Sequence, residues 1–117
     1  MKNVINNSLG KIEISKDVIA ILAGNAAIEC YGLVGMASRK MSDGITELLG
    51  RENLGRGVEV TLTEDKFVVD LYIIVQYGIK IHEVAHNIIE KVDFTLQRTL
   101  GLSPDEINII VHGVRIK

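Results

Sequence analysis

The sequence predicts an α+β protein: a small mixed β-sheet, made of a hairpin and a parallel crossover strand, with two main helices packed on one of its faces. Three observations lead to this fold class. Apolar and polar residues alternate over 58–77, a helical apolar period runs over 80–100, and alternation returns over 106–116. A strand, a helix and a further strand in this order form a parallel crossover within one sheet. We expect residues 1–9 to be a flexible N-terminal tail and residues 10–117 to form a single domain.

The composition is that of a small domain with a substantial hydrophobic core. Of the 117 residues, 47% are hydrophobic, and the mean hydropathy is +0.24, which argues against disorder beyond the tail. A net charge of −2 and an aromatic share of 4% argue against nucleic-acid binding, because they provide neither a positive field nor enough rings to stack bases.

The chain carries no segment that predicts export or a membrane span. Its amino terminus lacks the apolar run of a signal peptide. The most apolar segment, 67–75, is interrupted by Asp70 and is too short to cross a bilayer as a helix. We therefore expect a cytoplasmic protein with no direct membrane span, whose association with a membrane would depend on a surface or a partner.

The first helix is predicted from its start signal. GKIEIS, residues 10–15, is a short alternating strand, and Ser15 can cap a helix that runs to about Glu29. The predicted core residues of this helix are Val18, Ile19, Leu22, Ala26 and Ile28. Many of its other residues are small, and Gly24 alone costs about 1 kcal/mol of helix propensity relative to Ala. We expect close internal packing to compensate, with an intermolecular helix contact as the alternative.

Glycines and charges mark the segment that follows. YGLVGMAS, residues 31–38, is predicted to be extended, with its two glycines at a turn or a close backbone approach. In the polar region 39–57 we predict a short helix that begins near Ser42 or Asp43 and ends by Gly50. Four residues make this region locally basic: Arg39, Lys40, Arg51 and Arg56. We interpret the region as a solvated loop; a patch for anionic lipid headgroups or an acidic partner is the alternative.

The remaining elements follow from periodicity. The hairpin 58–77 turns around Glu64 and Asp65. A long helix is predicted from about Lys80 to Leu100, and the last strand is EINIIVHGVRI.

One face of this sheet is expected to stay partly uncovered. The helices should pack on the face of the sheet that carries Phe67 and its alternate neighbours, because that face is the more apolar. Five residues on the other face would then form an exposed apolar patch, which is the kind of patch that marks an interface. They are Val68, Tyr72, Ile74, Ile110 and His112.

The long helix contains the motif H-E-x-x-H, the signature of zinc metalloproteases. His82 and His86, four residues apart, lie on the same side of a helix. The extended metzincin pattern would require glycine and histidine where this chain has Ile89 and Val92. The broad apolar stripe of the helix is its strongest signal, and the two histidines only border that stripe.

A third zinc ligand is also missing from the predicted topology. His112 is expected on the sheet face opposite the helix, and Cys30 is the only cysteine, so it can join neither a disulfide nor a cysteine cluster. We therefore predict no catalytic residue, no metal and no cofactor. The alternative is a small zinc metallohydrolase that uses His82, Glu83 and His86.

Three segments of the sequence follow one another along the chain: GKIEISKDVIAILAGNAAIE, then GLVGM, then VAHNIIEKV…LGL…EINIIVHGVRI. They cover about residues 10–116, and together they resemble the alkaline shock protein family, the envelope stress response proteins of Gram-positive bacteria, in particular its short YloU-like members. Two positions depart from the family's pattern. Cys30 and Tyr31 stand where a small residue or proline is expected, and the two helix histidines match no histidine signature of the family, which favours coincidence over a protease.

The resemblance implies a non-enzymatic, abundant cytoplasmic protein that works at the inner side of the membrane through a partner. Such a protein would support cell-envelope homeostasis and would tend to self-associate as a homo-oligomer; the family brings no catalytic or cofactor residues. Our leading hypothesis is therefore an interaction or scaffold protein with a membrane-anchored protein partner. The zinc hydrolase is the second, and a small RNA-binding module built on the basic region is the third, disfavoured by the acidic balance.

Overall fold

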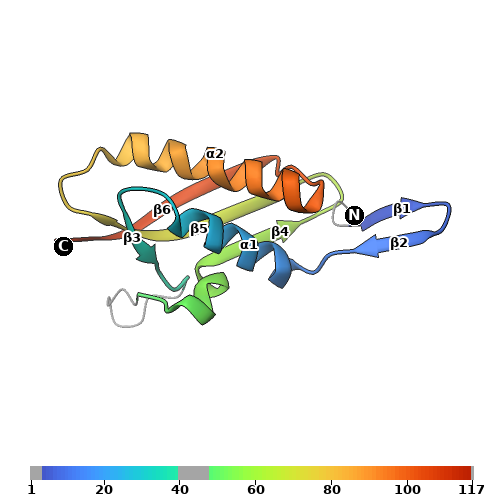
Figure 1. The fold of residues 1–117 in the computed structure, drawn as a ribbon, viewed down its shortest axis with the longest axis horizontal. Coiled ribbons are helices and arrows are strands. Elements are labelled where there is room, and N and C mark those ends of the chain that lie inside the picture. The colour runs from blue at the N-terminus through green and yellow to red at the C-terminus, as the bar shows by residue number, and fades with distance from the viewer. Residues whose placement is uncertain (1–3, 40–47, 117) are drawn as a thin grey trace.

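The computed structural model describes residues 4–39 and 48–116, with the exception of the Arg51 side chain. Figure 1 shows two main helices lying along a four-stranded sheet, with a separate hairpin at one end. The helices are α1 (Lys16–Ile28) and α2 (Ile81–Leu100). The strands of the sheet are β3 (Leu33–Met36), β4 (Val58–Leu62), β5 (Phe67–Gln76) and β6 (Glu106–Arg115).

Strand β5 is the centre of the sheet because it pairs along both of its edges. On one edge, β4 runs antiparallel to the first half of β5, and β3 runs antiparallel to the second half. On the other edge, β6 runs parallel to β5, with a register shift between Ile73 and Ile74. The predicted α+β class, with its hairpin and its parallel crossover strand, is confirmed.

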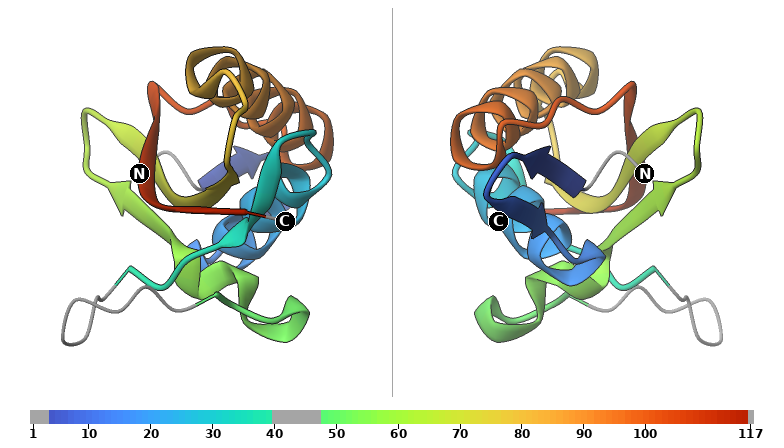
Figure 2. Two further views of the ribbon diagram at one scale, coloured as in Figure 1. Left: turned by 90° about the vertical axis from the view of Figure 1, so that its left-hand side faces the viewer. Right: turned by 90° about the vertical axis from the view of Figure 1, so that its right-hand side faces the viewer.

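The core lies between the sheet and the two helices, which Figure 2 shows on the same side of the sheet. Alternate residues of β5 are at most 1% exposed: Phe67, Val69, Leu71, Ile73 and Val75. From α2, the buried residues are Val84, Ile88, Val92 and Leu96, one per helical turn. Burial of each such side chain contributes about 1.5–3 kcal/mol to stability. The packing of the helices on the sheet is therefore a main source of the stability of the fold.

Helix α1 begins where the sequence predicts. Of its five predicted core residues, Ile19 and Ala26 are buried, Leu22 and Ile28 are half-buried against the core, and Val18 is exposed. The Val18 N–H donates to Ser15 Oγ at 3.3 Å, which caps the helix. Val18 itself is 44% exposed, whereas the buried residues are mostly small: Ile19, Ala20, Ala23, Gly24, Ala26 and Ala27. A Cβ on Gly24 would lie 3.1 Å from the carbonyl oxygen of Leu54. The small side chains therefore allow α1 to pack closely against the 3-10 helix η1 (Arg51–Gly57).

A strand lies where we expected a flexible tail. β1 (Val4–Asn7) pairs antiparallel with β2 (Gly10–Glu13), and this hairpin projects beyond the sheet in Figure 1. At the turn, Asn7 Oδ1 accepts hydrogen bonds from the N–H groups of Leu9 and Gly10 at 2.8 and 3.1 Å. These turn hydrogen bonds explain why the chain forms a hairpin from residue 4 onward, where we predicted a tail. Residues 1–3 are outside the described part.

The connection between β3 and β4 also differs from the prediction. The expected start of a short helix, Ser42 or Asp43, lies outside the described residues, and Leu48 at its expected end forms an isolated bridge with Ala37. Further along the chain, helix η1 forms within the segment that we predicted as a polar loop. A Cβ on Gly57 would lie only 2.6 Å from the Ala37 carbonyl oxygen, so glycine allows η1 to reach the end of β3.

Candidate functional site

The sheet face turned away from α1 and α2, which we call the second face, carries the predicted interface residues. Four of the five are half-buried there: Val68, Tyr72, Ile110 and His112. The fifth, Ile74, is 0% exposed and is not available at the surface. It lies opposite Gly35 on β3, and a Cβ on Gly35 would lie 2.6 Å from Leu48 Cδ1. Leu48 therefore covers this end of the second face, which explains why the alternation pattern overestimated its exposure.

Polar and aromatic contacts organise the rest of the second face. The rings of Tyr72 and His112 lie 5.0 Å apart at an angle of 54°, and Tyr72 Oη donates to Glu59 Oε1 at 3.4 Å. Beside them, Asn108 Nδ2 donates to Asp70 Oδ1 at 2.8 Å. Burial raises the pKa of Tyr72, and the charges of Glu59 and Asp70 raise it further. The phenol therefore stays neutral, and the face combines apolar side chains with polar contacts.

Two arginines from separate segments meet beside Tyr72. The Arg39 N–H donates to the Arg56 carbonyl oxygen at 3.4 Å. Together they line a surface hollow of about 510 Å³, which we call the arginine hollow; its lining residues are Ser38, Arg39, Arg56, Glu59 and Tyr72. Lys40 lies outside the described residues, and the Arg51 side chain is not described. Two of the four predicted basic side chains, Arg39 and Arg56, can therefore be placed.

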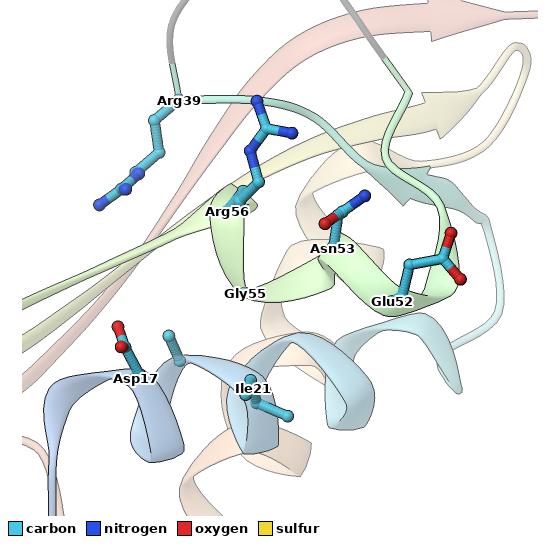
Figure 3. A pocket seen from close by; sticks show the side chains of 8 residues that line it. Asp17, Ile21, Arg39, Glu52, Asn53, Gly55 and Arg56 are labelled. Carbon is cyan, nitrogen blue, oxygen red and sulfur yellow. The ribbon is translucent and has the colours of Figure 1, made fainter.

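The same arginines border a second pocket, of about 240 Å³, on the helix side. Figure 3 shows Asp17 and Ile21 on α1 at its base and Glu52 on η1 beside it, with Arg56 directed away from α1. The meeting of Arg39 and Arg56 was not predicted from the sequence. Its only signal was their common membership of the basic region, because nothing in the sequence predicts that residues on either side of a connection pair their backbones.

The H-E-x-x-H residues lie on the exposed surface of α2. Glu83 faces Lys80 at 3.7 Å, and His86 Nε2 lies 3.5 Å from Glu90 Oε1, with both side chains of the latter pair 67% exposed. His82 is exposed as well. Within residues 4–39 and 48–116, no three His, Cys, Asp or Glu side chains gather closely enough to hold a metal ion.

Cys30 is half-buried just beyond the end of α1. Its Sγ lies 3.9 Å from the Ala26 carbonyl oxygen. Burial raises the pKa of the thiol, and the nearby Lys91 charge only partly opposes this. A thiol held in its neutral form is a poor nucleophile, which agrees with a structural role near the helix end.

The length and hydropathy of the helices indicate whether one of them could span a membrane. α2 is 20 residues long, but only one stripe of it is buried, and many of its other residues are charged or polar. In the described part of the chain, no helix is both long enough and apolar enough to cross a membrane.

Known proteins match this chain over nearly its whole length. A family model, alkaline shock protein 23 family with a cell envelope-related function, matches residues 4–116. YloU of Bacillus subtilis (strain 168) is 50% identical over 113 residues, which is 96% of this chain and 94% of YloU. Spy1614 of Streptococcus pyogenes serotype M6 is 43% identical over 113 residues, 96% of this chain and 93% of that protein.

A more distant relative, YqhY of Bacillus subtilis, is 38% identical over 107 residues, 92% of this chain and 78% of YqhY. No solved structure matches the chain significantly. The resemblance found in the sequence is thus confirmed: the chain belongs to the alkaline shock protein 23 family, whose function is related to the cell envelope.

Proposed function

We propose that this protein is a non-enzymatic cytoplasmic scaffold that self-associates and binds a membrane-anchored partner protein through its second face, in support of cell-envelope homeostasis. One observation carries the proposal. Both main helices pack on one side of the sheet (Figure 2), so that Tyr72, Ile110 and His112 on the other side remain half-exposed in the single chain.

The chemistry of the second face supports a protein partner. Tyr and His side chains present an apolar body and a polar tip, and aromatic residues are enriched where proteins meet. Tyr72 and His112 contact each other, and Glu59 holds the Tyr72 hydroxyl. Their positions are therefore set before binding, which lowers the entropy cost of forming an interface.

The proposal is tested by placing a charge at the centre of the second face. In the variant Ile110→Glu, light scattering should show a lower oligomer mass than the wild type, because a carboxylate would be desolvated at the contact. Tyr72→Ala serves as a second variant, and circular dichroism verifies that both fold. Thr99→Glu is the matched control, since Thr99 is exposed on α2, away from the sheet.

Partner binding is tested with the same variants. Wild-type protein bearing an affinity tag should capture a membrane protein from the membrane fraction of the native host, and Ile110→Glu should not. Equal capture by the wild type, Ile110→Glu and Thr99→Glu would contradict the role of the second face. A wild type that is monomeric at every concentration would contradict self-association.

A further inference from the structure

The arginine hollow presents positive charge that the described part of the chain does not pair. Arg39 and Arg56 are exposed, and neither forms an ion pair with a described residue. Of the described lining residues, only Glu59 carries a negative charge, and its Oε1 already accepts from Tyr72. The hollow therefore has an excess of one positive charge on the side of the second face. Asp17 and Glu52 border the separate pocket on the helix side.

The opposite charge is found on the turn between β4 and β5, which we call the acidic turn and define as Glu64 and Asp65. Both side chains are exposed, and neither forms a described ion pair. The turn is held by two hydrogen bonds of 2.9 Å between Thr63 and Lys66, one through the Thr63 N–H and one through the Lys66 N–H. The Lys66 ammonium is engaged by Glu106 at 2.9 Å, so it leaves the charge of the acidic turn uncompensated.

A single copy cannot bring its own acidic turn into its own arginine hollow. Arg56 precedes β4 and the acidic turn follows it, and β4 has five residues, so the two sites are more than about 17 Å apart along a paired strand. All five residues of β4 pair with β5, which fixes the path of β4 between the two sites. Among the described residues, the acidic turn is an opposite charge that only a second copy of this chain can bring to the hollow.

We propose that the acidic turn of one copy docks into the arginine hollow of the next copy, with Glu64 and Asp65 facing Arg39 and Arg56. The inference rests on the proposed self-association and specifies its contact. Because the two surfaces differ, the contact is heterologous: it repeats from copy to copy and builds open chains or closed rings. The net charge of −2 opposes unspecific association, so this local match of charges would set both the partner and its orientation.

Charge exchange between two full-length variants tests the docking. The hollow variant is Arg39→Glu with Arg56→Glu, and the turn variant is Glu64→Lys with Asp65→Lys. Each variant alone carries like charges on both surfaces and should remain at the monomer mass of 12.9 kDa in light scattering. An equimolar mixture restores opposite charges at every contact and should recover at least the dimer mass.

Two further measurements accompany the mixture. Wild-type association should weaken as salt is raised from about 0.05 to about 0.5 M, because the Debye length shortens over this range. Lys80→Glu with Arg98→Glu is the matched control, since both residues are exposed on the helix side and the change in net charge equals that of the hollow variant. This control should keep the wild-type mass.

Three results would overturn the docking, and they are distinguishable. If the wild type associates while the mixture stays monomeric, another surface carries self-association, and the proposed function survives. If the hollow variant loses capture of a membrane protein but keeps its oligomer mass, the hollow takes an acidic partner rather than a second copy. If the wild type never exceeds 12.9 kDa, both the docking and the proposed self-association fail.

Discussion

Replacing Ile74 by Ala tests whether one end of the second face is closed. The Ile74 side chain is 0% exposed, and its partners in register are Gly35 on β3 and Gly113 on β6. Neither glycine has a side chain that could move into the vacated space. Truncation of a buried Ile costs about 2–5 kcal/mol, more where the site cannot collapse, so we expect a loss of about 3–5 kcal/mol.

Such a loss is large for this protein. A domain of this size has a free energy of unfolding of about 5–15 kcal/mol, and about 4 °C in Tm corresponds to each kcal/mol. We therefore expect Ile74→Ala to melt roughly 12–20 °C below the wild type. Urea denaturation followed by far-UV circular dichroism is the suitable assay, because the chain has no tryptophan and the linear dependence on urea yields the free energy directly.

Val114→Ala is the matched control for Ile74→Ala. Val114 lies on β6, next in sequence to the glycine beside Ile74, but it is 50% exposed. Its truncation should cost less than about 1 kcal/mol. If the two variants lose the same free energy of unfolding, Ile74 is not buried in solution and the closure of the second face by Leu48 is refuted.

Three further predictions follow from the packing and the charges. Gly57→Ala should lose about 1–3 kcal/mol in urea denaturation, because its Cβ would clash with the Ala37 carbonyl oxygen; Gly50→Ala, where the nearest described atom is 3.7 Å away on a flexible side chain, should not, and equal losses would contradict the close approach. Because burial raises the pKa of Cys30 above its ordinary 9.0, iodoacetamide should alkylate the native protein at pH 9 more slowly than the urea-unfolded chain. The stability that the neutral thiol contributes is then complete below pH 9.0 and is lost as the pH rises through the raised pKa; equal alkylation rates would count against its burial. Untagged protein should contain no stoichiometric zinc, and His86→Ala should leave Tm unchanged, since the His86 side chain is 67% exposed; zinc at one equivalent that His86→Ala removes would revive the hydrolase hypothesis.

The elements with a single clear period were predicted from the sequence alone. α2 has one apolar stripe and one polar side, so its bounds and its buried residues Val84 and Ile88 follow from spacing. β5 alternates strictly enough to assign its core face. α1 is apolar on nearly all sides, and its period does not distinguish the buried face. The contact between Gly24 and Leu54 selects that face, and this contact exists only in the folded chain.

Some features of the candidate site were likewise predicted from the sequence, and others depended on the folded chain. Alternation along β5 and β6 placed Tyr72 and His112 on one face, and their ring contact confirms this. The burial of Ile74 and the meeting of Arg39 with Arg56 depended on the tertiary structure. Both result from the segment between β3 and β4, whose ends are joined through contacts between residues distant in the sequence. A periodic pattern describes how one element faces its neighbours, but the path of a connecting segment depends on contacts that no local pattern encodes.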